Sequence, residues 1–247
     1  MTDVLGYRSK IGILVPSTNS TVQPEMDDLR PPGVTNHIGR LRVSNVAFRT
    51  AADAHRIVAE ALRDLEPALS ALLTCNPDHL IMGMAVPCFW GGMEGCQGVH
   101  LRMRAVTDKP LILPPEAMTA ALGVLGARRV GIVTPYLPAA DEHVARYFGE
   151  AGFDVAAITG LRAPTEDQVV DITPQALMIA FEGLNTATVD ALVHVGTSIA
   201  MSRLVEDAER ALGKPVVSVN IACYWAALRR AGIADRRDGF GRLLRDH

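Results

Sequence analysis

The chain has 247 residues, of which 49% are hydrophobic and 21% are charged, and this apolar content is enough for two buried cores. The formal net charge is only −3 and no dense run of Lys or Arg occurs, so we expect no nucleic-acid partner. No apolar stretch approaches the roughly 20 residues that span a bilayer, and the first residues lack an apolar signal core, which predicts a soluble, cytoplasmic protein without membrane contact.

Apolar runs of strand length alternate with segments of helical period along the chain. The predicted strands are 10–15, 37–43, 79–84, 111–113, 129–134, 154–159, 191–195 and 215–219. The predicted helices are 52–74, 97–107, 116–125, 138–151, 173–186, 200–211 and 220–231. Because strands separated by helices form parallel sheets with right-handed crossovers, the predicted fold class is α/β.

The first predicted strand ends in a polar segment. Its apolar run stops at Pro16 and is followed by five hydroxyl and amide side chains, which are Ser17, Thr18, Asn19, Ser20 and Thr21. The carboxyl edge of a parallel sheet is where open α/β folds bind their ligands. This segment is therefore the first candidate binding region.

The same pattern returns in the second half of the chain. Residues 129–136 repeat the apolar run, the Gly at its third place, and the Pro followed by a polar side chain. Two further pairs of segments match in the same order, 79–83 with 192–196 and 107–113 with 212–218. Such junctions are common in α/β proteins, but three ordered matches favour a duplication. We predict two pseudo-symmetric, Rossmann-like parallel-sheet domains, with the active site in the crevice between them.

The domain boundary is predicted near 116–127, where a short helix leads into the second half. The last helix starts at Asn220 and corresponds to the helix after Pro115, so we expect it to pack back on the first half. The predicted first domain therefore comprises 1–116 plus 220–247, and the second comprises 117–219.

The four cysteines, Cys75, Cys88, Cys96 and Cys223, form no Cys-x-x-Cys motif. Cys88 and Cys96 are eight residues apart, with no His at ligand spacing between them. The sequence therefore predicts reduced thiols and no metal site.

Four strand ends are predicted to converge on the crevice. The candidate binding residues at these ends are Pro16, Ser17, Asn19, Met84, Ala85, Val86, Thr134, Tyr136, Gly196, Thr197 and Ser198. Their side chains are mostly neutral hydrogen-bond donors, which suit a small carboxylate or dicarboxylate and the charge that develops on an enolate. No Gly-x-Gly-x-x-Gly follows the first strand and no phosphate loop occurs, so we expect no cofactor.

Several segments together resemble the maleate isomerase and arylmalonate decarboxylase family of the aspartate/glutamate racemase superfamily. They are 16–21 (Pro-Ser-Thr-Asn-Ser-Thr), 134–136 (Thr-Pro-Tyr), 196–198 (Gly-Thr-Ser), 212–225 and 239–243. The resemblance implies enzymes that use no metal or organic cofactor and act on substrates with one or two carboxylates. It also implies that cysteine performs the covalent or proton-transfer step. Asn19 matches the carboxylate-binding Asn of the family. Tyr136 matches its Thr-Pro-Tyr tyrosine, which contacts carboxylate or assists proton transfer, so the resemblance makes Tyr136 a candidate catalytic residue.

The sequence departs from the family at both cysteine positions. Gly196 stands where the second cysteine is expected, and Met84 stands at the first. Cys88 lies four residues after Met84 and is the candidate catalytic thiol, provided that a helix start lowers its pKa. The alternative is that Cys88, next to Phe89, is a packing residue.

Glu166 occupies the place where many relatives carry a carboxylate-binding Asn. A glutamate there would repel a dicarboxylate unless it is protonated, and it is a candidate general base. The alternative is an exposed loop carboxylate next to Asp167.

We predict a cofactor-independent enzyme that acts on a small carboxylate or dicarboxylate through an enolate, as a decarboxylase or a maleate cis–trans isomerase. The alternative is a non-catalytic carboxylate-binding or sensor protein of the same fold. A wall of Met82, Met84, Phe89, Trp90 and Met93 would favour a substrate with an apolar group, and the alternative is that these residues belong to the core. Two-domain enzymes of this type often pair, so a homo-oligomer is a candidate assembly.

Overall fold

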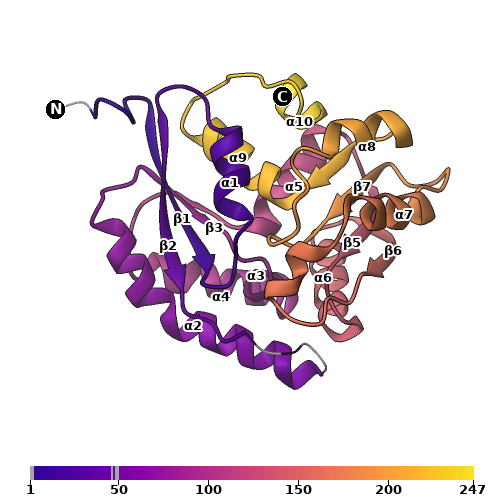
Figure 1. Ribbon diagram of the computed structural model, residues 1–247, viewed down its shortest axis with the longest axis horizontal. Coiled ribbons are helices and arrows are strands. Elements are labelled where there is room, and N and C mark those ends of the chain that lie inside the picture. Colours follow the sequence, from indigo (N-terminus) through magenta and orange to yellow (C-terminus); the bar gives the residue numbers. More distant parts are fainter. Residues whose placement is uncertain (1–2, 46, 48–49) are drawn as a thin grey trace.

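The computed structural model describes residues 3–45, 47 and 50–247. It contains two four-stranded sheets, and every strand pairing in them is parallel. The first sheet has the order β2 (Val34–Leu41), β1 (Ser9–Pro16), β3 (His79–Met82), β4 (Leu111–Ile112). The second has the order β6 (Asp154–Gly160), β5 (Arg129–Thr134), β7 (Ala191–His194), β8 (Val216–Ser218). The α/β class and the repeated sheet order are thus confirmed (Figure 1).

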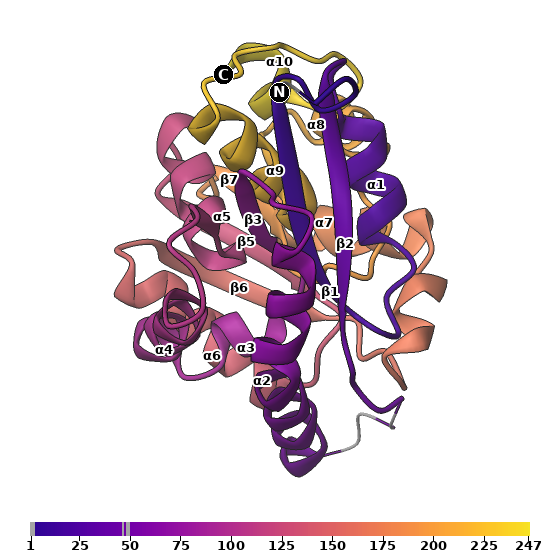
Figure 2. The same cartoon turned by 90° about the vertical axis from the view of Figure 1, so that its left-hand side faces the viewer.

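The helices follow the strands in both halves. Their bounds are α1 (Val22–Leu29), α2 (Ala51–Leu73), α3 (Val86–Phe89), α4 (Gly92–Arg104), α5 (Pro114–Val124), α6 (Pro138–Glu150), η1 (a 3₁₀ helix, Asp167–Asp171), α7 (Pro174–Leu184), α8 (Val205–Leu212), α9 (Val219–Arg230) and α10 (Arg242–Asp246). Helix α2 packs against β1 and β2 (Figure 2), whereas α9 packs against β3 and β4. Within the described residues, no helix combines the length and apolar character that crossing a bilayer requires.

Helix α9 lies beside α1 and α5 although it comes after the last strand (Figure 1). It contacts β3 and β4 of the first sheet and also β8 of the second, and α5 contacts β8 as well. Helices α5 and α9 thus lie at the junction of the two halves, and the assignment of 220–247 to the first domain stays a prediction.

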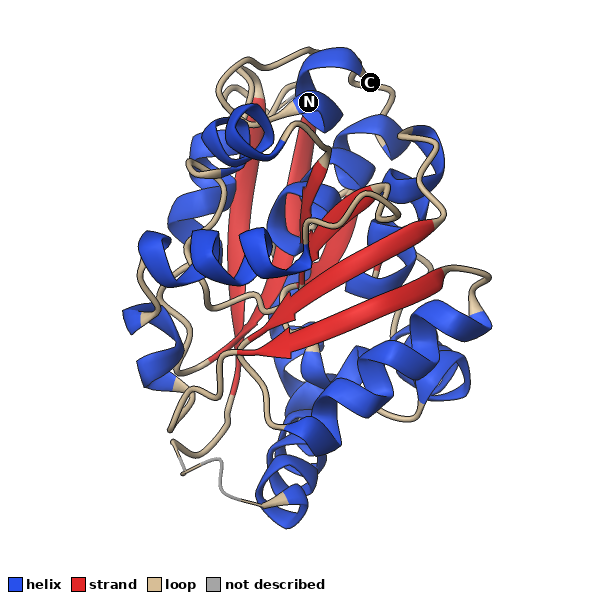
Figure 3. Cartoon of the chain, turned by 90° about the vertical axis from the view of Figure 1, so that its right-hand side faces the viewer, coloured by secondary structure: helices blue, strands red, loops and turns tan. Residues whose placement is uncertain are grey.

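The strands could be predicted from the sequence because their side chains are buried and therefore apolar. In β1 the side chains of Ile11, Ile13 and Leu14 are fully buried, as expected for a parallel strand covered on both faces. The strands of the two sheets run toward a common region, so that their carboxyl ends face one another (Figure 3). This geometry places the polar strand ends together.

The α-helices α1, α3 and α10 and the 3₁₀ helix η1 were not predicted, and the predicted helices 173–186 and 200–211 are shorter than expected. The predicted helix 200–211 begins only at Val205, because the N–H groups of Met201 and Ser202 are bound by Glu25 of α1 instead. The predicted strand 37–43 runs instead from Val34 to Leu41.

Candidate functional site

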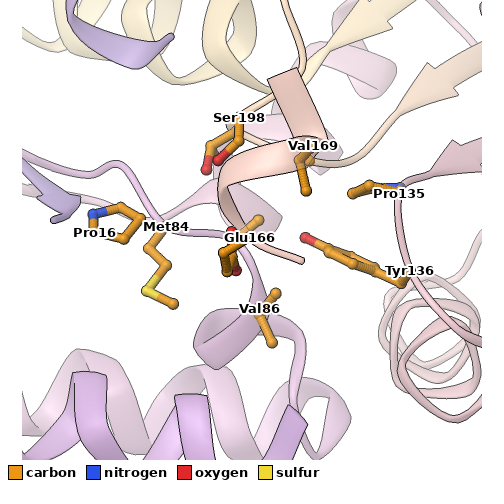
Figure 4. A pocket seen from close by; sticks show the side chains of 11 residues that line it. Pro16, Met84, Val86, Pro135, Tyr136, Glu166, Val169 and Ser198 are labelled. Atoms are coloured by element: carbon orange, nitrogen blue, oxygen red, sulfur yellow. The ribbon is translucent and has the colours of Figure 1, made fainter. Parts of the chain in front are cut away.

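A small pocket lies where the carboxyl ends of β1, β3, β5 and β7 meet (Figure 4). It holds about 270 Å³ of space, including its mouth. Its lining comes from both halves of the chain and consists of Pro16, Met84, Ala85, Val86, Pro135, Tyr136, Glu166, Val169, Gly196, Thr197 and Ser198. The structure thus brings together nine of the residues that the sequence singled out, and it adds Pro135 and Val169.

Two sets of consecutive backbone N–H groups belong to residues that line this pocket. One set belongs to Met84, Ala85 and Val86 after β3, and the other belongs to Gly196, Thr197 and Ser198 after β7. None of these six groups has an acceptor within the part of the chain that the structure describes. Consecutive unpaired N–H groups at a turn form a concave site for an anion. The pocket therefore offers two sets of neutral donors to a carboxylate or an enolate.

The hydroxyl of Ser198 is held in place by the first half of the chain. Its Oγ accepts a hydrogen bond from Asn19 Nδ2 at 2.8 Å, which leaves the hydroxyl proton available to a ligand. Asn19 Oδ1 accepts the N–H groups of Thr21 and Val22 at 3.0 and 2.8 Å, and Thr21 Oγ1 donates to the Ser198 carbonyl at 2.8 Å. Asn19 is buried and does not line the pocket, so its observed contacts orient Ser198 and the start of α1.

The segment between β7 and α8 is further fixed by Glu25, a buried carboxylate of α1. Oε1 accepts the N–H groups of Met201 and Ser202, each at 2.6 Å, and Oε2 accepts Asn220 Nδ2 at 2.7 Å. Asn220 Nδ2 also donates to the Thr197 carbonyl at 3.1 Å. Burial raises the pKa of Glu25, and these hydrogen bonds act in the opposite direction. Sequence reasoning missed Glu25, because an acidic residue close to Asp27 and Asp28 in a polar segment carries no sign of its distant partners.

Glu166 is the one carboxyl group among the residues that line the pocket. It precedes η1, and its side chain is 7% exposed. Within the described residues, its carboxyl group has no hydrogen-bond or ion-pair partner. Burial, assisted by the negative charge of Asp167, raises its pKa from 4.5 to about 7. The exposed-loop alternative for Glu166 is therefore wrong.

The hydroxyl of Tyr136 points across the pocket toward Glu166 (Figure 4). Burial, and then the negative charge of Glu166, raise the pKa of Tyr136 well above its ordinary value. Tyr136 is therefore a hydrogen-bond donor at neutral pH and a poor proton acceptor. Its backbone N–H donates to Thr134 Oγ1 at 3.1 Å, and Thr134 Oγ1 donates to Asp141 Oδ1 at 2.5 Å. Thr134 thus shapes the turn before Tyr136 and does not line the pocket.

No cysteine is among the residues that line the pocket. Cys88 lies in α3 and is fully buried. Burial raises the pKa of its thiol well above the ordinary value, and the nearby thiols of Cys96 and Cys223 act in the same direction. The expectation that a helix start lowers this pKa is wrong, because the apolar surroundings dominate.

Met84 and Gly196, the two positions that the resemblance assigns to the cysteines of the family, both line the pocket. Gly196 has φ of 141°, which L side chains rarely adopt, and an added Cβ would lie 2.7 Å from Pro135 Cδ. A thiol at position 196 would therefore require the strand end to move.

Ser17 does not line the pocket either. Its Oγ donates to the Val43 carbonyl and accepts the Val43 N–H, both at 3.2 Å, and so joins the segments after β1 and β2. Among the predicted site residues, four thus lie outside the pocket wall, and they are Ser17, Asn19, Thr134 and Cys88.

A second, apolar pocket adjoins the first and shares Val86 and Tyr136 with it. It holds about 340 Å³ and is otherwise lined by Thr50, Ala51, Ala54, Leu137, Ala139 and Ala140. The five apolar residues that the sequence suggested as one wall of the pocket mostly lie elsewhere. Met82 and Phe89 are buried in the core, Met93 is 46% exposed on α4, and only Met84 of that set lines the polar pocket.

Within the described residues, no group of three or more His, Cys, Asp or Glu side chains could hold a metal ion.

Comparison with known proteins gives consistent matches over nearly the whole chain. The family described as arylmalonate decarboxylase matches residues 11–244. A maleate isomerase from Nocardia farcinica is 30% identical over 98% of this chain and 97% of its own length. An arylmalonate decarboxylase from Bordetella bronchiseptica is 27% identical over 95% of each chain.

A solved structure shows a similar fold. It is a cysteine-to-serine variant of the Nocardia farcinica maleate cis–trans isomerase with a covalently bound succinylcysteine intermediate. It matches with a TM-score of 0.86 and 27% identity, over 97% of this chain and 99% of its own.

Proposed function

The chain belongs to the arylmalonate decarboxylase family, and we propose that it acts without a cofactor on a small carboxylate through an enolate that is protonated at carbon. Within the family's chemistry we favour a decarboxylase-type reaction over cis–trans isomerisation by thiol addition. The pocket supports binding a carboxylate with two sets of neutral donors, from Met84 to Val86 and from Gly196 to Ser198. The same donors would stabilise the enolate oxygens as charge develops on them.

One observation carries this proposal: the pocket has two sets of unpaired N–H groups and no thiol. The related isomerase forms a succinylcysteine intermediate, which requires a nucleophilic sulfur at the substrate. In this chain Met84 and Gly196 replace such a sulfur, and Cys88 is buried outside the pocket wall. Loss of carboxylate followed by protonation needs no nucleophile, because the electron pair passes to the carboxylate that remains.

The substrate class follows from the two adjoining pockets. The first pocket is lined by the donors that would hold the carboxylates, and the second pocket is lined almost wholly by apolar side chains. We therefore propose a malonate or related acid that carries an aryl, alkenyl or alkyl group. Its apolar group would pass between Val86 and Tyr136 into the second pocket.

The test is proton NMR of the purified protein in heavy water with no cofactor added. The panel contains maleate, aryl- and alkenylmalonates, and simple 2-substituted carboxylates. We expect loss of one carboxylate from a substituted malonate, with deuterium at the α-carbon of the product. Formation of fumarate from maleate would contradict the decarboxylase assignment and would establish an isomerase.

A non-catalytic binding protein is the second candidate, and the replacement of both thiols favours it. It predicts line-broadening of the carboxylates in the same spectra without turnover of any of them.

A further inference from the structure

We infer that Glu166 is the group that delivers the proton to the substrate carbon, and that it enters the reaction as a neutral carboxylic acid. This inference rests on the proposed function, since it assigns one step of that reaction. It gives the pocket a proton donor that is unlike the thiols of the family.

The position of Glu166 is the first support. Glu166 is 7% exposed and lines the pocket, and within the described residues its carboxyl group has no partner. A buried carboxylate without a compensating donor or cation is costly, so such a group holds its proton instead. A structural carboxylate would have partners, whereas this group points into the space that a ligand would fill.

The charges that face Glu166 are the second support. Asp167 beside it is acidic, and the Tyr136 hydroxyl across the pocket is neutral. Within the described residues, no Lys or Arg lines the pocket and no cation pairs with the Glu166 carboxyl. An anionic substrate adds a further negative charge in the same pocket, which favours the neutral acid still more. Substrate binding therefore increases the fraction of Glu166 that carries a proton.

The step balances without any further reactant. The bond between the α-carbon and the departing carboxylate breaks, CO₂ leaves, and the electron pair moves onto the remaining carboxylate as an enediolate. The Glu166 O–H bond then breaks as the new C–H bond forms at the α-carbon. Glu166 is left as a carboxylate, and it regains its proton from water after the product leaves.

The other polar groups of the pocket fit this step less well. Proton transfer is most efficient when the pKa of the donor lies near the working pH, and burial places that of Glu166 at about 7. The pKa of Tyr136 is raised far from that range, and Thr197 and Ser198 carry ordinary hydroxyls. Tyr136 and Ser198 are therefore assigned to holding the carboxylate.

The first experiment measures the protonation state and needs no substrate. Infrared spectra of wild type, Glu166→Gln and Asp167→Asn are recorded during a pH titration. We expect a carboxylic-acid carbonyl band that titrates near pH 7 in wild type, persists in Asp167→Asn and is missing in Glu166→Gln. Identical bands in wild type and Glu166→Gln would overturn the inference. Asp167 is the matched control because it is exposed and adjacent.

The second experiment measures turnover of the malonate identified by NMR. We expect Glu166→Gln to lower kcat by roughly 10²–10⁴-fold with little change in KM. Wild-type kcat/KM should fall as pH rises through about 7, and kcat should fall only at a higher pH, because the bound anion raises the pKa of Glu166 further. Full kcat in Glu166→Gln would overturn the inference and leave the proposed reaction standing. A wild type that shows the infrared band but no turnover of any substrate would overturn the proposed reaction instead.

Discussion

Two glutamates of this protein are buried to the same degree in very different surroundings. Glu25 and Glu166 are each 7% exposed, and burial raises the pKa of both. Glu25 accepts two backbone N–H groups and one amide N–H, whereas Glu166 has no partner within the described residues. Burial alone therefore does not separate a structural carboxyl from a functional one. The arrangement of donors around the carboxyl does.

The partners of Glu25 explain its role. They lie on the segment after β7 and on α9, so this carboxylate ties together three parts of the chain that are far apart in sequence. The same segment carries Thr197 and Ser198, which line the pocket. The hydrogen bonds of Glu25 and Asn220 therefore hold these two residues in place. Glu166 faces the ligand space itself.

The largest expected effect follows from removing the Glu25 carboxylate and its hydrogen bonds. We expect Glu25→Ala to lower the free energy of unfolding by about 4 kcal/mol, because two backbone donors and the Asn220 amide lose their acceptor in a buried site. Urea unfolding followed by circular dichroism measures it. Glu25→Gln is the matched control, since it keeps one acceptor oxygen and should lose less. Equal stability of Glu25→Ala and wild type would contradict the structural role.

The second prediction concerns the pH dependence that Glu166 imposes on stability. Its pKa is about 7 in the folded protein and 4.5 when unperturbed, so between these values the folded state binds more protons than the unfolded state. This contribution to stability is complete at acidic pH and is lost as pH rises through about 7. Glu166→Gln should therefore become more stable relative to wild type, by roughly 2–3 kcal/mol, between about pH 5 and about pH 8.

Thermal or urea unfolding at several pH values tests this prediction. Asp167→Asn serves as the control, because it changes a neighbouring exposed charge and keeps the buried carboxyl. Parallel pH profiles for Glu166→Gln and wild type would show that Glu166 is not the buried acid described above.

The third prediction concerns Asn220, which donates to both Glu25 and the Thr197 carbonyl. We expect Asn220→Ala to lower the free energy of unfolding by about 2 kcal/mol, since two buried hydrogen bonds are lost. Its effect should largely disappear in the Glu25→Ala background, because the two side chains act as one network. A double-mutant cycle measures the coupling, and additive effects would contradict it.

The smallest predicted effect belongs to Asn19. Asn19→Ala removes an acceptor for the N–H groups of Thr21 and Val22 at the start of α1, and should cost about 1 kcal/mol. It also releases Ser198, so ligand affinity should fall more than stability does. Asn19→Asp, which keeps the acceptor oxygen, should restore most of the stability. Unfolding curves and ligand titrations of the two variants separate the effects.

Much of the site could be predicted because strand ends are readable from the sequence. Apolar runs ending at Pro16, Gly83 and Val195 marked three carboxyl ends, and the residues at these ends line the pocket. The family resemblance stated from these segments is confirmed. Cys88 shows the limit: its position four residues after Met84 suggested a catalytic thiol, and the turn of α3 places it among buried neighbours.

The sequence by itself determined the elements that local pattern controls, namely the parallel strands, their repeat in two halves and the polar segments that follow them. Only the tertiary structure decided which of these polar groups are free. Asn19 and Ser198 are 179 residues apart, and Glu25 and Met201 are 176 apart. Hydrogen-bond partners at such separations leave no periodic signal, because they are chosen by the packing of the two halves. The same packing leaves Glu166 buried without a partner.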